Sequence, residues 1–356
     1  PDMTPLRLAW INGDGISAEI LASAEVALAA LGPTLSRPVT LERENVGLAA
    51  LEQTGTTLPD RVVALARDAD GVVLGPVSHN VYPAVEDGGL NPSGVLRKAL
   101  DLHANIRPAH TWAGVASLST APFDLIVVRE NLEGFYADRN MVEGAGEFSP
   151  VPGVALALRK ITQANSIRIA QTAFAIAATR PRPRVTAIHK ANVMRLTDGL
   201  FLDTVREVAR AHPDIAYDEM LVDAAAAHLV RAPDQCDVLV TTNMFGDILS
   251  DLASELSGGL GLAGSLNLGE RHALAQAQHG SAPDIAGKDR ANPTSMLVSL
   301  AMLLRHLGQG QAATTLEAAL ATCLSSPTTR TRDLGGPLGT DAFTQTLVAT
   351  LQEATV

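Results

Sequence analysis

The stretch FGDILSDLASE at residues 245–255 places two carboxylates, Asp247 and Asp251, four residues apart. On a helix they lie one turn apart, and like charges at this spacing destabilise the helix by roughly a few tenths of a kcal/mol. A helical wheel predicts an opposite, apolar face made of Phe245, Ile248, Leu249, Leu252 and Leu256. The carboxylate pair fits either a solvated helix face or a divalent-cation site, because Mg²⁺ and Mn²⁺ prefer oxygen ligands.

Three arginines stand in polar segments near expected strand ends. Arg97 and Arg107 lie in GVLRKALDLHANIRPA (94–109), and Arg129 directly follows the apolar run DLIVV. Guanidinium groups match carboxylates with paired hydrogen bonds. Each arginine alone could belong to a structural ion pair, but together they suggest a polycarboxylate substrate.

Two further side chains are candidates for proton transfer. Lys190 ends the run VTAIHK, where it could act as a general base or simply reach solvent. Tyr136, one of three tyrosines, follows Arg129 in RENLEGFYAD and could donate a proton or serve only in packing.

Short apolar runs alternate with longer helical patterns, which predicts an α/β fold. The apolar residues of the runs are mostly adjacent, as in a sheet covered on both faces. The predicted strands are residues 6–11, 71–75, 124–128, 185–188 and 237–242. The predicted helices are residues 18–31, 166–180 (with Ser166 as its cap), 197–211, 294–308 and 341–354. Loops are expected at 75–94, 138–153 and 257–293.

Polar clusters follow four of the five predicted strands, beginning at Asn12, Arg129, His189 and Asn243. Ligands of open α/β folds gather beyond the carboxyl ends of strands, so this distribution indicates a site. GLGLAG (259–264) matches the dinucleotide fingerprint G-x-G-x-x-G, but it follows a helix rather than a strand. We therefore interpret it as a glycine-rich loop.

Composition narrows the class of protein. The 356 residues are 46% hydrophobic and 18% charged, which allows a large core, and the net charge of −11 argues against nucleic-acid binding. Only two cysteines, Cys236 and Cys323, are present, which excludes a cysteine-rich zinc site. With no long apolar run and no signal-peptide pattern, we expect a soluble, cytoplasmic protein without a membrane partner.

From about residue 6 onward the chain resembles the metal-dependent β-decarboxylating dehydrogenases. This family includes isocitrate, isopropylmalate, homoisocitrate and tartrate/D-malate dehydrogenases. The resemblance rests on seven segments in family order: GDGISAE, LRKALDLHANIRPA, VRENLEGFY, HKANVMRLTDGLF, VDAAAAHLV, NMFGDILSDLASE and HGSAPDIAGKDRANP.

The resemblance implies a role for each candidate. Arg97, Arg107 and Arg129 would bind the malate part of the substrate, and Asp247 and Asp251 would hold Mg²⁺ or Mn²⁺. Asp223 would complete the metal site from the neighbouring subunit, so the active unit would be a homodimer. Lys190, from that same neighbour, would be the base and Tyr136 the acid, with Asn192 close to substrate and nicotinamide.

The resemblance also implies the cofactor site and the fold. The adenosine end of the cofactor would lie on HGSAPDIAGK, through His279, Gly280, Ser281, Ala282, Asp284 and Ile285, and on Asn292. A carboxylate at Asp284 accepts hydrogen bonds from a ribose 2′-hydroxyl and repels a 2′-phosphate, so we predict NAD. The fold would have two α/β domains without a Rossmann fingerprint: residues 1–102 with 258–356 for the cofactor, and 103–257 with the dimer interface.

The sequence departs from the family at three places. Ser17 and Ala18 replace the usual Gly-Pro, which should alter a helix start, and Gln276 stands where relatives usually carry Glu. On the turn before Arg97, Ser93 and Gly94 occupy the places where isopropylmalate enzymes carry Leu residues, and Asn91 precedes them. This predicts a small or polar C3 substituent, as in isocitrate, homoisocitrate, tartrate or D-malate.

Three alternatives stay open. Isopropylmalate remains a possible substrate, because neighbouring loops could supply an apolar wall. A non-catalytic regulatory subunit would not need the retained Lys190 and Tyr136. A metal-binding α/β protein without redox chemistry would not need the HGSAPDIAGK segment.

Overall fold

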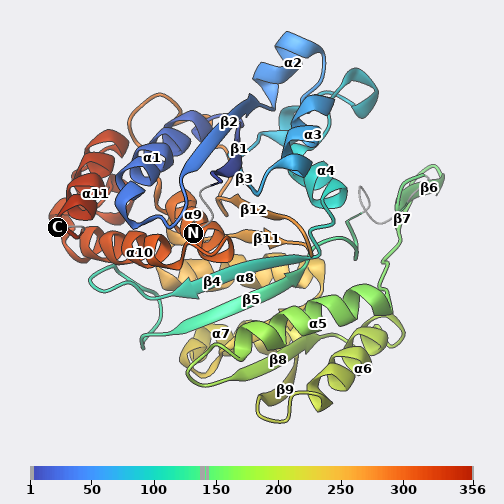
Figure 1. The fold of residues 1–356 in the computed structure, drawn as a ribbon. Helices are drawn as coiled ribbons and strands as arrows, with labels where there is room; N and C mark the ends of the chain where they lie inside the picture. The colour runs from blue at the N-terminus through green and yellow to red at the C-terminus, as the bar shows by residue number, and fades with distance from the viewer. Residues whose placement is uncertain (1–3, 137–140, 142–143, 355–356) are drawn as a thin grey trace.

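The computed structural model describes residues 4–136, 141 and 144–354. These residues form a mixed α/β fold around one ten-stranded sheet of order β2-β1-β3-β12-β11-β4-β5-β10-β8-β9, with helices packed on its faces (Figure 1). The strands are β1 (Leu6–Asn12), β2 (Val39–Asn45), β3 (Gly71–Leu74), β4 (Ala104–His110), β5 (Asp124–Glu130), β8 (Arg184–His189), β9 (Ala216–Leu221), β10 (Val238–Thr241), β11 (Leu266–Leu268) and β12 (Ala273–Gln276).

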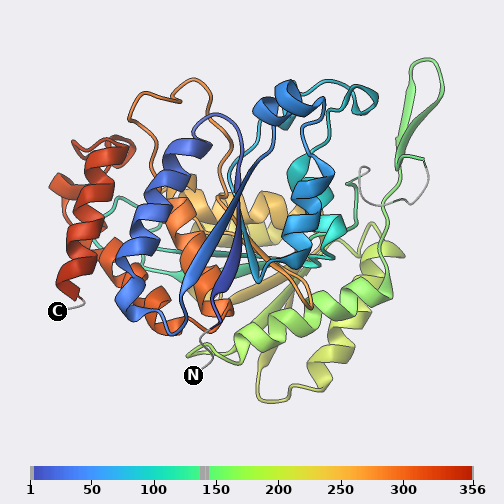
Figure 2. The same cartoon turned by 45° about the horizontal axis from the view of Figure 1, so that its top comes forward.

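Helices connect most of these strands. They are α1 (Ser17–Ala30), α2 (Leu48–Thr54), α3 (Asp60–Asp68), α4 (Pro92–Ala99), α5 (Gln163–Ala177), α6 (Thr197–Arg210), α7 (Val222–Arg231), α8 (Asn243–Ser257), α9 (Thr294–His306), α10 (Gly310–Ser325) and α11 (Thr340–Ala354). A separate antiparallel hairpin, β6 (Glu147–Val151) with β7 (Val154–Ala157), projects from the body of the molecule (Figures 1 and 2).

The predicted α/β class is confirmed, and each of the five predicted strands and five predicted helices has its counterpart. β3 and β10 are buried along their whole length, because helices cover both faces of the sheet there. β10 pairs in parallel with both β5 and β8. The carboxyl ends of these strands therefore meet at one edge, where Arg129 lies near the end of β5 and where Lys190 and Asn243 follow β8 and β10.

Two of the loop predictions were wrong in part. Residues 257–293 contain β11 and β12, which have only three and four residues and so lack a readable period. Residues 138–153 contain β6, while 138–140 and 142–143 lie outside the described residues. Residues 75–94 form a largely irregular connection with two short 3-10 helices, as expected for a long loop.

Two local predictions also need correction. The cap of α5 is Thr162, whose side-chain oxygen accepts from the Asn165 N–H, whereas Ser166 is buried inside the helix. The buried face of α8 consists largely of small side chains that let the helix approach β4 and β5, together with Leu249 and Leu256. Ile248, which the wheel assigned to the buried stripe, is 60% exposed.

Four hydrophobic clusters form the core. Two of them each combine buried residues from 8–102 with buried residues from 262–351, and one of these two also contains Trp112. The buried residues of the other two clusters all lie within 104–256. Cys323 lies in a cluster of the first kind and Cys236 in one of the second kind; both are buried, and neither forms a disulfide.

Two expected features of the chain can be compared with the structure. GLGLAG follows α8 and leads through a short 3-10 helix into β11, so it lacks the strand–turn–helix context of a dinucleotide fingerprint. None of the helices in the described part of the chain is long and apolar enough to cross a membrane.

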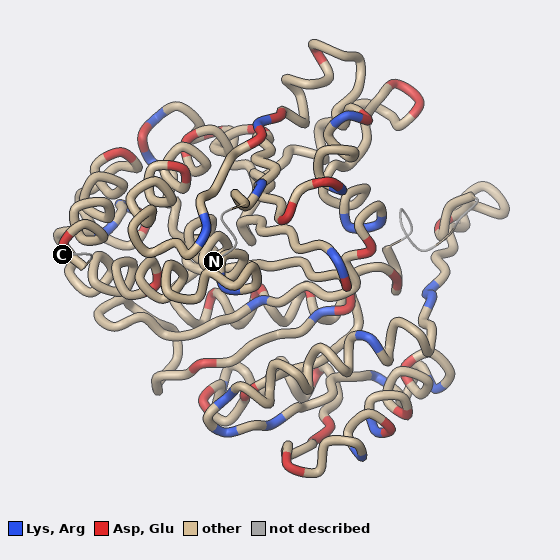
Figure 3. The backbone as a smooth tube through the Cα atoms, in the orientation of Figure 1, with Lys and Arg blue, Asp and Glu red and all other residues tan. Residues whose placement is uncertain are grey.

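Acidic and basic positions are interspersed along the chain, so the negative charge is not gathered on one element (Figure 3).

Candidate active site

A cavity of about 310 Å³ lies between α4, strands β4 and β5, α8 and the segment that follows β12. We call it the arginine cavity, because Arg97, Arg107 and Arg129 all line it. The other predicted site residues that line it are Asn91, Ser93, Tyr136, Asp247, His279 and Gly280. Residues up to about 190 positions apart in the chain thus meet in one small polar space.

Arg107 relieves the repulsion between the two carboxylates of α8, Asp247 and Asp251. Its Nη1 donates to Asp247 Oδ1 at 3.1 Å, to Asp251 Oδ1 at 3.3 Å and to Ser250 Oγ at 2.8 Å. Its Nε donates to Asn105 Oδ1 at 2.6 Å, which fixes the guanidinium plane. The cation that relieves the repulsion therefore comes from β4, far away in sequence.

Arg129 holds the same helix from β5. It is 2% exposed, its Nε donates to Asn243 Oδ1 at 2.9 Å, and its Nη1 contacts Asp247 Oδ1. Gly246 permits this approach, because a Cβ at that position would lie 2.6 Å from Cγ of Arg129. The glycine of FGD is thus required by the close packing of α8 on β5.

Tyr136 joins the same network. Its hydroxyl donates to Asp247 Oδ2 at 2.6 Å and accepts from Arg129 Nη2 at 3.0 Å. A phenol held between a guanidinium and a carboxylate at the cavity wall is well placed to exchange a proton with a bound molecule.

The charge state of Asp247 follows from these contacts. Burial acts to raise the pKa of Asp247, but the Arg129 and Arg107 guanidinium charges outweigh it and hold that pKa below its usual value. Asp247 is therefore ionised at neutral pH. Asp247 and Asp251 remain 38% and 50% exposed, so they present two charged oxygen ligands on one helical face.

This donor set fits Mg²⁺ or Mn²⁺, which bind carboxylate oxygens and retain water molecules. It is incomplete within one chain. Among the described residues no three His, Cys, Asp or Glu side chains are grouped closely enough to hold a metal ion. Asp223 therefore does not join Asp247 and Asp251 in the same subunit.

Lys190, Asp223 and Asn192 lie outside the lining of the arginine cavity. Lys190 Nζ instead donates to Asp223 Oδ1 at 2.6 Å, and this hydrogen bond lowers the pKa of Asp223. Asp223 lies in the first turn of α7 and its side chain is 67% exposed, and Asn192 is exposed on the turn after β8. Lys190 and Asp223 thus form a polar pair on the surface of the chain, and Asn192 lies two residues after Lys190.

The predicted cofactor residues follow β12 in one loop that packs on the start of α1. The Ser281 carbonyl accepts from the Ile16 N–H at 2.8 Å, and Ser281 Oγ shares a 2.6 Å hydrogen bond with Ser78 Oγ. Asp284 is exposed and Ile285 half-buried, while Ala282 takes a positive φ of 38°. Burial lowers the pKa of His279, so its ring is neutral near pH 7.

Asn292 closes this loop at its far end. Its Nδ2 donates to Asp333 Oδ2 at 2.9 Å, and its Oδ1 accepts from the Thr294 N–H at 3.0 Å, at the start of α9. Both the nitrogen and the oxygen of the Asn292 amide thus already have a hydrogen-bond partner within the chain.

The turn before Arg97 forms one wall of the arginine cavity. Asn91 caps α4 by accepting from the Gly94 N–H at 3.3 Å, and Ser93 Oγ donates to Gln276 Oε1 at 2.9 Å. Gln276 ends β12, is 8% exposed and also lines the cavity. The part of the cavity wall that Asn91, Ser93 and Gln276 form is therefore polar and uncharged.

Several residues of the site were missed by sequence reasoning. Asn105 and Asn243 orient the arginines, and Gln278 donates to Asp251 Oδ1. Ser250 had a readable signal, since it lies on the same helical face as Asp247. Asn243 was noted only as the start of a polar cluster, and its bond to Arg129 was not predicted. Asn105 and Gln278 had no signal, because a lone amide in or just after a strand does not disclose its partner.

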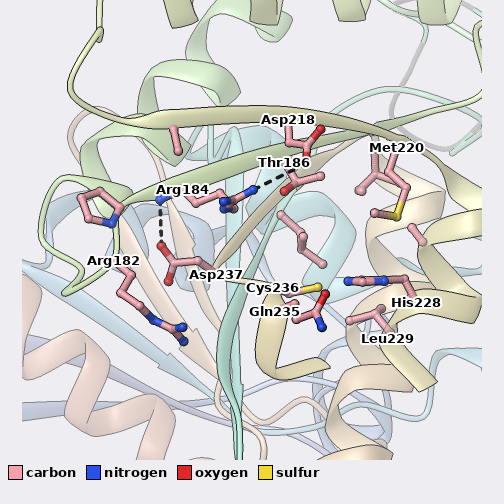
Figure 4. A pocket seen from close by; sticks show the side chains of 15 residues that line it. Arg182, Arg184, Thr186, Asp218, Met220, His228, Leu229, Gln235, Cys236 and Asp237 are labelled. Atoms are coloured by element: carbon pink, nitrogen blue, oxygen red, sulfur yellow. Dashed lines mark hydrogen bonds and ion pairs between the residues drawn. The ribbon is translucent and has the colours of Figure 1, made fainter. Parts of the chain in front are cut away.

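A larger cavity of about 580 Å³ lies between α7 and strands β8 and β9 (Figure 4). Arg184 pairs there with Asp218 at 3.6 Å, and its backbone N–H donates to Asp237 Oδ2 at 3.1 Å. None of the predicted site residues lines this cavity. The candidate active site is therefore the smaller arginine cavity.

Comparison with known proteins identifies the family of the chain. The family model for isocitrate/isopropylmalate dehydrogenase matches residues 7–350. The 3-isopropylmalate dehydrogenase of Archaeoglobus fulgidus is 41% identical over 345 residues, covering 97% of this chain and 99% of that one. The isocitrate/homoisocitrate dehydrogenase of Thermus thermophilus is 40% identical over 346 residues, covering 97% and 98%.

A solved structure leads to the same family. The isocitrate dehydrogenase from Methylococcus capsulatus superposes with a TM-score of 0.89 at 38% identity, covering 98% of this chain and 99% of that one. The chain therefore belongs to the isocitrate/isopropylmalate dehydrogenase family of oxidative decarboxylating dehydrogenases, which act on a hydroxy acid.

Proposed function

We propose that this enzyme carries out the NAD-dependent and Mg²⁺- or Mn²⁺-dependent oxidative decarboxylation of a 3-substituted malate with a small or polar C3 substituent. The observation that carries the proposal is the arginine cavity. It brings three buried arginines, Tyr136 and an ionised Asp247 together in about 310 Å³. This is the chemistry that a dicarboxylate with a reacting hydroxyl group requires.

The arginines would bind and orient the two malate carboxylates. Arg107 and Arg129 are braced by Asn105 and Asn243, so their donors are fixed before substrate arrives. Asp247 and Asp251 would hold the divalent cation, which when bound supplies Lewis-acid polarisation of the substrate oxygens.

Proton transfers would belong to two other residues. Lys190 would take the proton of the C2 hydroxyl as the hydride leaves C2, and a bound nicotinamide would supply the hydride acceptor. Tyr136 would return a proton to C3 after CO₂ has left. Its position between Arg129 and Asp247 supports this role.

The active unit would be a homodimer with shared sites. Lys190 and Asp223 are paired at the surface, away from the arginine cavity of their own chain, which supports their acting in the cavity of a second copy. The β6–β7 hairpin is exposed along its whole length, including Phe148 and Val151. An isolated two-stranded hairpin is only marginally stable in water, so a partner that covers it is expected.

The cofactor would be NAD. Asp284 is exposed in the loop after β12, where its carboxylate would accept from a ribose 2′-hydroxyl and repel a 2′-phosphate. Residues 1–102 with 258–356 would form the cofactor domain and 103–257 the second domain. The division of the hydrophobic clusters supports this boundary.

The wall formed by Asn91, Ser93 and Gln276 favours a polar C3 substituent, as in isocitrate, homoisocitrate, tartrate or D-malate. One observation favours isopropylmalate as the second candidate. Val77 and Ala277 also line the cavity and supply a small apolar surface.

The test is NADH formation with NAD and Mn²⁺ on isocitrate, homoisocitrate, tartrate, D-malate and isopropylmalate. A kcat/KM at least about tenfold higher for one of the polar substrates is the expected result. A preference for isopropylmalate would overturn the specificity and keep the reaction. Inactivity on all five substrates would contradict the proposed function itself.

A further inference from the structure

Gln278 links the segment after β12 to the helix that carries both expected metal ligands. Its Nε2 donates to Asp251 Oδ1 at 2.8 Å and to Ser254 Oγ at 3.0 Å. Its backbone N–H donates to Ser295 Oγ at 3.0 Å, so the residue is held from both ends. The Asp251 carboxylate in turn receives donors from two sides, Gln278 and Arg107.

The other end of this amide lacks a partner. Gln278 Oε1 is buried and has no hydrogen bond to any described residue, and Gln278 lines the arginine cavity. The amide cannot gain by turning over, because Oε1 would then face the Asp251 carboxylate. A buried acceptor without a donor costs about 1–3 kcal/mol, so this atom is suited to a donor that arrives with a ligand.

A hydrated divalent cation brings such donors. Mg²⁺ and Mn²⁺ usually keep several water molecules in their coordination shell. A carboxylate ligand that is itself hydrogen-bonded is held in the orientation that the cation needs. Gln278 therefore has one group suited to Asp251 and one suited to a water molecule or a substrate hydroxyl.

We infer that Gln278 is a positioning residue of the cation site, which orients Asp251 through Nε2 and accepts a hydrogen bond from a cation-borne water or the substrate hydroxyl through Oε1. This inference rests on the proposed function, since it assumes that Asp251 binds the cation. It adds a residue from outside the α8 carboxylates, and it joins the cation site directly to the segment that continues into the cofactor loop at His279.

The experiment is calorimetric titration of the intact wild-type protein with Mn²⁺ alone, beside Gln278→Leu, Gln278→Ala and Gln276→Leu. Gln276→Leu is the matched control, because the same change is made two residues away, at a side chain that bonds to Ser93 rather than to Asp251. Both Gln278 variants should raise the Mn²⁺ Kd about tenfold or more. Gln276→Leu should change the Mn²⁺ Kd by less than about twofold. Loss of a residue that supports a metal ligand typically changes metal affinity by about tenfold or more.

Thermal unfolding without metal separates this role from a merely structural one, since the metal-free Tm of at least one Gln278 variant should match that of the wild type. If a folded Gln278 variant binds Mn²⁺ as the wild type does, the inference is wrong and the proposed function stands. If the wild type itself binds no Mn²⁺, the cation site of the proposed function fails, and this inference fails with it.

Discussion

Gly246 lies directly against Arg129, so that a Cβ atom on the glycine would stand 2.6 Å from Cγ and 2.7 Å from Cβ of the arginine. This contact sets how closely α8 approaches β5. It thereby sets the position of Asp247, the next residue in the chain, relative to the Arg129 guanidinium group, whose charge lowers the pKa of Asp247.

Gly246→Ala should therefore damage the site and the fold together. Overpacking of a buried contact destabilises by about 1–3 kcal/mol, and the displaced helix should lower kcat/KM by about tenfold or more. Denaturant unfolding and steady-state kinetics measure the two effects. Gly199→Ala is the matched control, because Gly199 also lies near the start of a helix but has open space around its Cβ direction. Equal behaviour of the two variants would show that the close packing is unimportant.

Mixing two inactive variants tests the shared site. Lys190→Ala and Asp247→Asn should each abolish oxidation, the first by removing the base and the second by removing a cation ligand. If Lys190 acts in the partner's cavity, each mixed dimer regains one intact site, and random reassembly should restore about a quarter of wild-type activity. The mixture is refolded together and assayed for NADH formation. No recovery would place both residues in one chain's site.

The loop after β12 allows a test of the cofactor. Asp284→Lys combined with Ile285→Tyr replaces a repelling carboxylate with a cation and a hydroxyl group, so the ratio of kcat/KM for NAD to that for NADP should fall by about tenfold or more. Asp284→Asn separates the loss of charge from the gain of a cation and should give an intermediate ratio. A wild-type enzyme that uses NADP as well as NAD would already disprove the prediction.

Glu130 makes stability depend on pH. Burial and the nearby Glu133 raise the pKa of Glu130 to about 7 in the folded chain, from an ordinary value of 4.5. Above pH 4.5 the unfolded chain loses this proton more readily than the folded one. Stability should therefore fall as the pH rises from 4.5 to 7 and then level off, by roughly 3 kcal/mol at most. Denaturant unfolding between pH 5 and 8 measures this fall.

Glu130→Gln is the control for that dependence. It removes the titrating group, although it also weakens one of the two bonds from the Leu132 and Glu133 N–H groups, so its stability should be lower at pH 5. Its unfolding free energy should nevertheless vary less between pH 5 and 7 than that of the wild type. Parallel profiles for the two proteins would rule out Glu130 as the source.

Sequence reasoning reached the parts of the molecule whose signal is local. Buried strands could be predicted because they are continuous apolar runs. Four site residues could be proposed as a group because they follow those strands or lie in the segments that carry the family resemblance: Arg97, Arg107, Arg129 and Tyr136. The short strands β11 and β12 and the contact of Gln278 with Asp251 could not be read, because they depend on pairing between segments far apart in the chain.

The carboxylate pair of α8 illustrates the same dependence on distant segments. The sequence predicted that Asp247 and Asp251 repel each other on one helix, but it did not predict which cation relieves this repulsion. Arg107 lies 140 residues before Asp247, and only folding brings its Nη1 to both carboxylates. The predicted roles of Lys190 and Asp223 depend on a second chain and stay predictions.

The two buried thiols give this chain a built-in pair of probes. Cys323 is packed among residues from the two ends of the sequence and Cys236 among residues from its middle. Cys323 is 2% exposed and becomes accessible to a labelling reagent only when its cluster opens, so its labelling rate reports the local opening of that half. Cys236 lines the larger cavity, so its labelling rate reports access to that cavity. The two rates can then be compared in the unmodified protein, without introducing any foreign label site.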